Sequence, residues 1–169
     1  MTFEKQSYRV WIIVASDKGF MGERKDLSGP IVREMIIDAG FTSAGFSLLP
    51  DDQSGLENEM KRICDNELAD LIITSGGTGF SQQDSMPEAT LAVAERLVPG
   101  IADAMRAGAM VINKNAMLSR AVSVIRGKTL IVNLPGSPKV IRDNLKCIIG
   151  ELQTGLDILT GRETEFTTQ

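Results

Sequence analysis

The sequence alternates two kinds of apolar segment, and this alternation constrains the fold more than any other feature. Four short runs have the length and the β-branched or aliphatic side chains of strands. They cover residues 10–15, 44–49, 71–74 and 128–134. Most of them are apolar throughout, which is typical of strands buried on both faces. The intervening segments carry apolar residues at helical spacing. The alternation predicts an α/β fold in three layers, with a mostly parallel central sheet and helices on both faces.

Turn and capping residues mark where the predicted helices begin. Gly29-Pro30 opens the first helix, and Ser54-Gly55-Leu56-Glu57 has the pattern of a capping box for the second. Pro87-Glu88 begins a helix through about residue 97, and a further helix follows Pro99-Gly100. Ser137-Pro138 then begins a long final helix, with Ser137 as its cap.

The 169 residues, 43% of them hydrophobic, are enough for one domain and one core, and too few for two full-sized domains. We expect a single domain over residues 1–169, with a core from about 8 to 160 and a flexible polar tail from Gly161 onwards. The longest early apolar run, residues 10–15, is far shorter than a membrane span or a signal-peptide core. A cytoplasmic location without a membrane partner is therefore expected.

The two cysteines also favour a cytoplasmic location. Cys64 and Cys147 are too few for a disulfide framework and lack the spacing of metal ligands. We interpret both as buried thiols in a reducing compartment.

Charge and histidine content exclude several classes of function. The chain has 18 basic and 22 acidic residues, for a net charge of −4, which argues against a nucleic-acid binder with a broad basic surface. The chain has no histidine, which excludes Ser-His-Asp and Cys-His catalysis, imidazole bases and metal sites built on imidazole. Any chemistry must use carboxylates, backbone amides, hydroxyls, Lys, Arg or a bound metal ion.

The segments that follow the predicted strands are all polar or rich in glycine. In parallel α/β folds, ligands bind beyond the carboxyl ends of the strands, so these segments predict the ligand edge of the sheet. They are Ser16-Asp17, Pro50-Asp51-Asp52, Thr74 to Gly79 with Asp84, and Pro135 to Lys139.

The glycine-rich segment Ser75-Gly76-Gly77-Thr78-Gly79 has two possible interpretations. Glycines at positive φ can turn successive N–H groups into a cradle for a phosphate. A tight turn from strand to helix needs the same glycines for geometry alone. The segment matches neither a dinucleotide G-x-G-x-x-G nor a Walker A motif, so the sequence leaves both interpretations open.

Asp51 and Asp84 are the candidate catalytic and metal-binding residues. A phosphate-handling site without histidine would recruit Mg²⁺ through oxygen ligands, and two acids at one rim can share an ion. The alternative is structural, because Asp51 can start a turn and Asp84 can favour the start of a helix. Asp52 and Asp17 are weaker candidates on the same grounds.

Basic residues and a helix start complete the candidate site. Arg120, after Ser119, can present a guanidinium to a phosphate, although an ordinary ion pair explains it equally well. The segment Pro135-Gly136-Ser137-Pro138-Lys139 offers N–H groups, a hydroxyl and an ammonium to an anion at a helix N-terminus. A plain capped helix start is the competing interpretation.

Taken together, these segments resemble the molybdopterin adenylyltransferases of molybdenum cofactor biosynthesis, the MogA type within the MogA/MoaB fold group. The resemblance spans residues near 8 to 160. It rests on seven segments in family order: Ser16-Asp17; Gly22 with Asp26-Leu27-Ser28-Gly29-Pro30; Leu49-Pro50-Asp51; Thr74 to Gly79; Asp84 with Pro87-Glu88-Ala89-Thr90; Leu118-Ser119-Arg120; and Asn133 to Lys139.

The resemblance implies the fold of molybdenum cofactor biosynthesis proteins, a homotrimer, and an enzyme that adenylylates molybdopterin with Mg-ATP and releases pyrophosphate. It also implies a possible hand-off to a molybdate-insertion protein. Asp51 and Asp84 match the family's two essential acids. The residues expected to bind the nucleotide and the pterin are Asp17, Ser75, Gly76, Gly77, Thr78, Gly79, Ser119, Arg120, Pro135, Gly136, Ser137 and Lys139.

Relatives of this fold do not all share that activity, so fold alone does not fix it. The alternatives are a non-catalytic carrier of molybdopterin or nucleotide, a MoaB-like relative without adenylyltransferase activity, and a relative that acts on another nucleotide. One departure concerns charge, because Gln82-Gln83 stands where some relatives carry basic residues. With a net charge of −4, positive potential would come from a metal, amide dipoles, Arg120 and Lys139.

Overall fold

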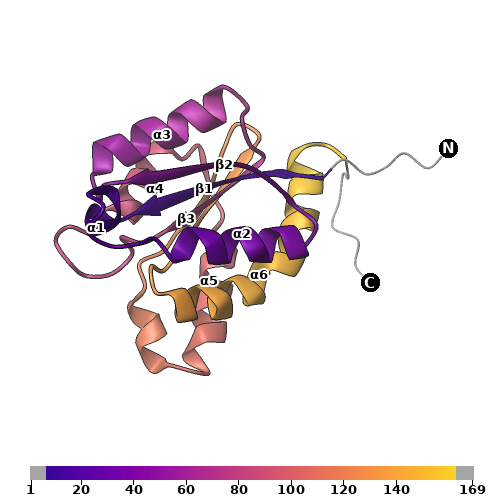
Figure 1. Cartoon of the computed structure of the whole chain (residues 1–169). Coiled ribbons are helices and arrows are strands. Elements are labelled where there is room, and N and C mark those ends of the chain that lie inside the picture. Colours follow the sequence, from indigo (N-terminus) through magenta and orange to yellow (C-terminus); the bar gives the residue numbers. More distant parts are fainter. Residues whose placement is uncertain (1–6, 163–169) are drawn as a thin grey trace.

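The computed structural model describes residues 7–162 and forms around one mixed sheet. The strand order is β2-β1-β3-β6-β5-β4 (Figure 1). Strands β2, β1, β3 and β6 are parallel to one another, whereas β5 pairs antiparallel with β6 and β4 pairs antiparallel with β5. The strands are β1 (Arg9–Ala15), β2 (Thr42–Leu49), β3 (Leu71–Ser75), β4 (Arg96–Leu97), β5 (Ser123–Arg126) and β6 (Thr129–Leu134). The predicted mostly parallel α/β sheet is confirmed.

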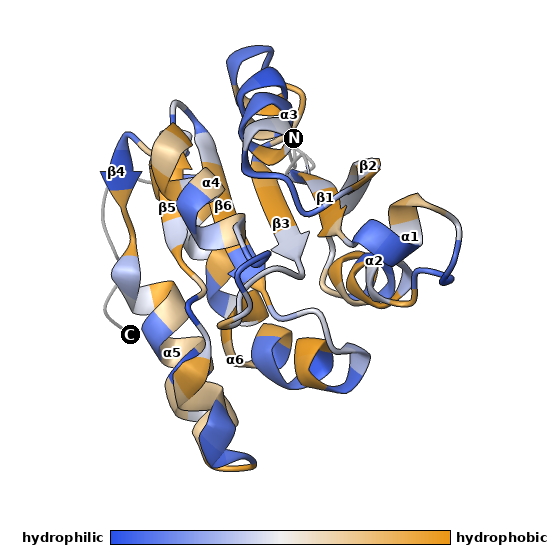
Figure 2. Ribbon diagram, turned by 90° about the vertical axis from the view of Figure 1, so that its left-hand side faces the viewer, coloured by the Kyte–Doolittle hydropathy of each residue, from blue (hydrophilic) through white to orange (hydrophobic). Residues whose placement is uncertain are grey.

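Helices cover both faces of this sheet, as the alternation predicted. Helices α2, α5 and α6 pack on one face, whereas α3 and α4 pack on the other, which leaves the apolar strands between two helical layers (Figure 2). The helices are α1 (Asp17–Phe20), α2 (Ser28–Asp38), α3 (Gln53–Asp65), α4 (Met86–Val93), α5 (Pro99–Met110), the 3₁₀ helix η1 (Lys114–Leu118) and α6 (Pro138–Leu159).

Strand β1 illustrates why the central strands are apolar at almost every position. Val10, Ile12 and Val14 enter the core beneath α2, α5 and α6. Ile13 and Ala15 point the other way, into the core beneath α3 and α4. Because both faces of the sheet are covered, both faces of the strand must be apolar.

Two short strands were missed. The helix predicted from Pro87 is present, but its predicted end at about residue 97 was wrong. Helix α4 ends at Val93, and Arg96–Leu97 instead pairs with Ile125 and Val124 of β5. A two-residue edge strand is too short to show a period in sequence. Strand β5 returns into β6 through a hairpin at Gly127, whose φ is +57°.

The predicted capping box at Ser54 was also wrong. Asp52 is the N-cap of α3, and its carboxylate accepts a hydrogen bond from the Gly55 N–H at 2.7 Å. Asp and Ser are both good N-caps, so a capping pattern in sequence does not decide between them. Here the helix begins after Asp52, two positions before Ser54. Ser137 is the N-cap residue of α6, as predicted, but its side chain makes no capping hydrogen bond.

The cysteine interpretation needs one correction. Cys64 is buried, and burial raises the pKa of its thiol to about 11, but Cys147 is exposed on α6. Both thiols are free. The predicted polar tail lies, beyond Arg162, outside the described residues. Among the helices of residues 7–162, none combines the length and apolarity needed to span a membrane.

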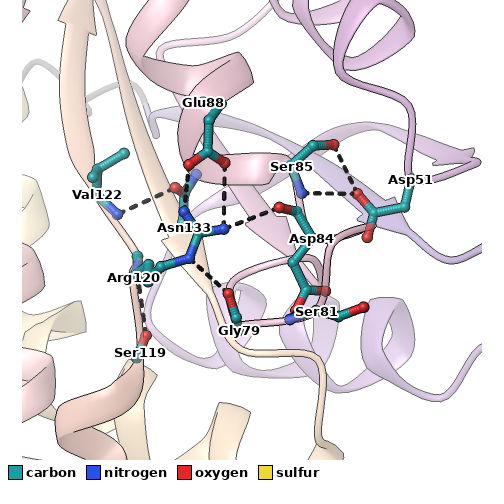
Figure 3. Close-up of polar contacts among 11 residues, drawn as sticks. Asp51, Gly79, Ser81, Asp84, Ser85, Glu88, Ser119, Arg120, Val122 and Asn133 are labelled. Atoms are coloured by element: carbon teal, nitrogen blue, oxygen red, sulfur yellow. Dashed lines mark hydrogen bonds and ion pairs between the residues drawn. The ribbon is translucent and has the colours of Figure 1, made fainter.

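The buried side chain of Asn133 makes three hydrogen bonds, one of which joins the sheet to α4. Its amide nitrogen donates to the hydroxyls of Thr74, at 3.0 Å, and of Thr90, at 2.9 Å. Its amide oxygen accepts from the Val122 N–H at 3.2 Å (Figure 3). Asn133, Thr74 and Thr90 are fully buried, so neither threonine hydroxyl can bond to water in place of the amide.

We therefore expect Asn133→Ala to lower the free energy of unfolding by about 2–4 kcal/mol, because two buried hydroxyls and the Val122 N–H lose a partner. The measurement is urea-induced unfolding followed by circular dichroism. Asn66→Ala is the control, since exposed Asn66 donates one amide hydrogen bond to the Arg62 carbonyl, and it should cost less than about 1 kcal/mol. Equal losses in the two variants would contradict this account of Asn133.

Candidate functional site

The predicted ligand segments meet at the carboxyl edge of the parallel strands. The Ser16 N–H donates to the Leu49 carbonyl at 2.9 Å, which joins the ends of β1 and β2. The Gly76 N–H donates to the Leu134 carbonyl at 3.2 Å, and the Ser75 hydroxyl donates to the Pro135 carbonyl at 3.0 Å. Segments that lie up to 120 positions apart in the sequence, at about residues 16 and 136, therefore share one edge.

Asp51 is held in place from two sides. Its backbone N–H donates to the Asp17 carboxylate at 2.8 Å. Its own Oδ1 accepts from the Ser85 hydroxyl at 3.0 Å and from the Ser85 N–H at 3.4 Å (Figure 3). Ser85, the N-cap residue of α4, could not be selected from the sequence because no spacing links it to Asp51.

The electrostatic surroundings of Asp51 favour a cation. Partial burial raises the pKa of its carboxyl, and the nearby charges of Asp84 and Asp17 raise the pKa further, while the hydrogen bonds from Ser85 oppose the shift. A positive ion beside Asp51 would offset both the desolvation and the repulsion among these carboxylates.

The glycine-rich loop adopts backbone conformations that favour glycine. Gly76 and Gly77 have φ values of +96° and +67°. A Cβ on Gly77 would lie 2.8 Å and 2.9 Å from the two carboxylate oxygens of Asp51, and a Cβ on Gly79 would lie 2.8 Å from Asp84 Oδ2. The glycines thus allow two acidic side chains to pack directly against the loop backbone.

Asp84 closes the same loop. Its Oδ2 accepts from the Ser81 N–H at 2.9 Å, and its own N–H donates to the Ser81 carbonyl at 3.0 Å. Of the two acidic side chains, Asp51 Oδ2 and Asp84 Oδ1 remain without a hydrogen-bond donor in residues 7–162.

Free carboxylate oxygens are the type of donor that Mg²⁺ takes in proteins. Mg²⁺ is commonly bound through one or two carboxylates together with substrate phosphates, rather than by an all-protein cage. No cluster of three or more acidic or Cys side chains suitable for a metal occurs in the described part of the chain. Two carboxylates alone would leave most of the shell of such an ion to water or to substrate oxygens.

Arg120 uses its guanidinium within the protein. Nε donates to the Gly79 carbonyl at 2.6 Å, Nη2 donates to the Asp84 carbonyl at 2.9 Å, and both terminal nitrogens contact the Glu88 carboxylate (Figure 3). The Arg120 N–H also donates to the Thr78 carbonyl at 2.9 Å. The hydrogen bond from Arg120 lowers the pKa of the Glu88 carboxyl. Arg120 therefore holds both ends of the loop that carries Asp84.

The other predicted residues lie in neighbouring segments. Ser119 follows η1, and its hydroxyl accepts from the Ala121 N–H at 3.3 Å. Gly136 packs close to Gly76, since a Cβ on it would lie 3.3 Å from the Gly76 Cα. Thr78 is buried within the loop, and Lys139 is exposed in the first turn of α6.

A cavity of about 440 Å³ opens at this edge of the sheet. Ser75, Gly76 and Gly136 to Pro138 line it, and so do Arg24 and Lys25 from the loop between α1 and α2. Sequence reasoning did not select Arg24 or Lys25, because two charges in a polar loop carry no spacing signal. A larger cavity, of about 670 Å³, lies between α2 and β2 and contains none of the predicted site residues.

The chain also matches known proteins along most of its length. Residues 11–154 match the model of the family described as "Probable molybdopterin binding domain". The chain is 33% identical to the molybdopterin adenylyltransferase of Helicobacter pylori strain J99, over 92% of this chain and 90% of that protein. It is 37% identical to the Escherichia coli K12 enzyme of the same name, over 82% of this chain and 72% of that protein.

A solved structure is also similar along almost the whole chain. The molybdopterin biosynthesis enzyme MoaB from Thermus thermophilus is 42% identical and superposes with a TM-score of 0.87. The match covers 91% of this chain and 97% of that one.

Proposed function

The chain belongs to the family of probable molybdopterin-binding domains, and we propose that it adenylylates molybdopterin with Mg-ATP, releasing pyrophosphate, in molybdenum cofactor biosynthesis. The observation that carries the proposal is the meeting of Asp51, Asp84 and the glycine-rich loop at the carboxyl edge of the sheet. This is the edge at which α/β folds bind ligands.

The proposed reaction suits a site without histidine. The terminal phosphate of molybdopterin attacks the α-phosphorus of ATP, a P–O bond forms, and the bond to the departing pyrophosphate breaks. A phosphate nucleophile is already ionised near pH 7, so no base has to remove a proton. Catalysis then depends on in-line alignment and on neutralising charge on the phosphate oxygens.

The two acids supply the oxygens for a magnesium ion in this proposal. Asp51 Oδ2 and Asp84 Oδ1 would hold Mg²⁺, which neutralises phosphate charge when it is bound. Asp17 and Ser85 orient Asp51, since one accepts its backbone N–H and the other donates to its carboxylate. The expected ligand contacts are the Ser75 to Gly79 loop, Ser119 and the Pro135 to Lys139 turn.

Arg120 has a positioning role in the proposal. Its guanidinium bridges the carbonyls of Gly79 and Asp84, so it acts on the reaction through the loop that presents Asp84.

We expect Arg120→Lys to lower kcat about 10- to 100-fold with little change in KM for ATP, because a lysine cannot bridge both carbonyls and the loop shifts. Glu88→Gln keeps an acceptor for Arg120 and should lower kcat by less than about fivefold. Steady-state kinetics of both variants make the measurement. A large rise in KM for ATP with kcat unchanged in Arg120→Lys would instead assign Arg120 to direct phosphate binding.

A non-catalytic carrier or a MoaB-like relative without adenylyltransferase activity is the second candidate, and the similarity to the MoaB structure favours retaining it. Turnover separates the two. Pyrophosphate release that requires molybdopterin, Mg²⁺ and ATP together supports the enzyme. Binding of both substrates without release would support the carrier, and ATP cleavage that ignores molybdopterin would favour another nucleotide reaction.

The proposal extends to assembly and location. It includes a homotrimer and hand-off of the product to a molybdate-insertion protein. It also includes a cytoplasmic site of action, because free thiols are typical of proteins in a reducing compartment. Exposed apolar side chains at the end of α5 and in η1, including Val111, Ile112 and Met117, offer a surface for contact between copies. A stable monomer at micromolar concentration in sedimentation would contradict the trimer.

A further inference from the structure

The proposed reaction brings together several phosphate groups, and the site described so far offers them little positive charge. The guanidinium of Arg120 is committed to Gly79, Asp84 and Glu88. Lys139 is exposed in the first turn of α6, but it does not line the cavity at this edge. The loop residues Gln82 and Gln83 are neutral, and the chain has a net charge of −4. Cationic groups from another segment would have to face the ligand.

The 440 Å³ cavity has such a segment in its wall. Part of the wall comes from the ends of the parallel strands and the start of α6, and it includes Ser16, Gly76 and Ser137. Another part is the loop between α1 and α2, which contributes Arg24 and Lys25. The volume is within the range of sites for small molecules, roughly 300–1,000 Å³.

Arg24 and Lys25 are available to a ligand. Both are exposed, and neither side chain makes a hydrogen bond or an ion pair with any other residue in the range 7–162. Their loop has a defined course, because the Arg24 N–H donates to the Lys18 carbonyl at 3.1 Å and the Glu23 N–H donates to the same carbonyl at 2.9 Å.

The one acidic residue in the cavity wall is already occupied. Asp26 lines the cavity, but its carboxylate accepts from the Ser28 N–H at 2.9 Å and from the Gly29 N–H at 3.1 Å, at the start of α2. The wall therefore presents two unpaired cations and one carboxylate whose oxygens are engaged.

We propose that Arg24 and Lys25 form a phosphate-binding subsite in this cavity. The ligand group is a phosphate ester, carried either by a nucleoside triphosphate or by the pterin substrate, and in this respect the subsite rests on the proposed function. A guanidinium binds two phosphate oxygens at once, and an ammonium adds a second charge beside it. The contiguity of the cavity with Ser75 and Gly76 puts such a phosphate next to the glycine-rich loop.

The test compares two double variants that remove the same charge. Arg24→Gln with Lys25→Gln alters the cavity, whereas Arg33→Gln with Lys146→Gln alters α2 and α6 away from it; Arg33 lines the larger cavity instead. Isothermal titration with pyrophosphate, ATP and molybdopterin, each with Mg²⁺, gives the affinities. We expect the first variant to bind at least one probe about tenfold or more weakly, and the control to stay within about twofold of the unaltered chain.

The probes distinguish the source of the phosphate. Weaker binding of ATP and pyrophosphate alone assigns the subsite to the nucleotide, and weaker binding of molybdopterin alone assigns it to the pterin phosphate. Unchanged affinity for all three, or an equal loss in the control variant, would overturn the subsite.

Two further measurements test whether a loss of affinity comes from the removed charge or from a loss of folded protein. The melting temperature of the first variant should match that of the control, and Arg24→Lys should recover part of the lost affinity because it restores the charge. Equal affinity in Arg24→Lys and Arg24→Gln would contradict a role for that charge. Because binding is measured without turnover, failure of the unaltered chain to release pyrophosphate would contradict the proposed function and leave the binding comparison intact.

Discussion

Asp84→Asn is expected to lower kcat for adenylyl transfer at least about 100-fold while the affinity for molybdopterin stays largely intact. An asparagine oxygen can still accept the Ser81 N–H, which Asp84 Oδ2 accepts at 2.9 Å, so the loop keeps its shape. The change removes the negative charge that would hold Mg²⁺ and leaves the backbone contacts of the site in place.

The matched control is Asp52→Asn, one residue beyond Asp51. Asp52 is exposed and caps α3 through the Gly55 N–H, and asparagine is an equally good cap, so activity and stability should change little. Kinetics and molybdopterin titration of both variants provide the measurement. Near-normal kcat in Asp84→Asn would remove Asp84 from the metal-binding pair.

Gly77→Ala is expected to have a comparably large effect, a loss of about 100-fold in kcat, through displacement of Asp51. The added Cβ would lie 2.8 Å from Asp51 Oδ2 and 2.9 Å from Oδ1, closer than such atoms can approach, so the carboxylate must move. The φ of +67° adds a backbone cost of about 1 kcal/mol.

Gly40→Ala separates the two contributions. Gly40, at the end of α2, has a φ of +87°, and a Cβ there would have no atom within 4 Å. It should therefore carry the backbone cost, read as a lower free energy of unfolding, without loss of kcat. If Gly77→Ala retained the kcat of Gly40→Ala, close packing of Asp51 on the loop would be irrelevant to catalysis.

The sequence was informative where one physical requirement repeats along the chain. A strand buried on both faces must be apolar at almost every position, as in Val10 to Ala15, so the parallel strands and the layers could be predicted. The carboxyl edge followed from topology, and the structure brings Asp17, Asp51, the glycine-rich loop and the Pro135 turn to that edge, as expected.

The sequence was uninformative where a role depends on long-range partners. Arg120 offers the same guanidinium whether it binds a ligand or the carbonyls of Gly79 and Asp84, and only the fold decides between these partners. Ser85 and Arg24 are ordinary polar residues until the fold puts one beside Asp51 and the other in the cavity wall. Strand β4 needs β5 beside it to exist at all.

The central claim is the transfer of an adenylyl group, and labelled ATP tests it most directly. ATP carrying the label on its α-phosphate is incubated with the protein, molybdopterin and Mg²⁺, and the label is followed after separation of nucleotide from pterin. The proposed function predicts that the label moves to the pterin with an equal amount of pyrophosphate formed, and that Asp84→Asn prevents the transfer. Binding of both substrates with all of the label remaining in ATP would contradict it.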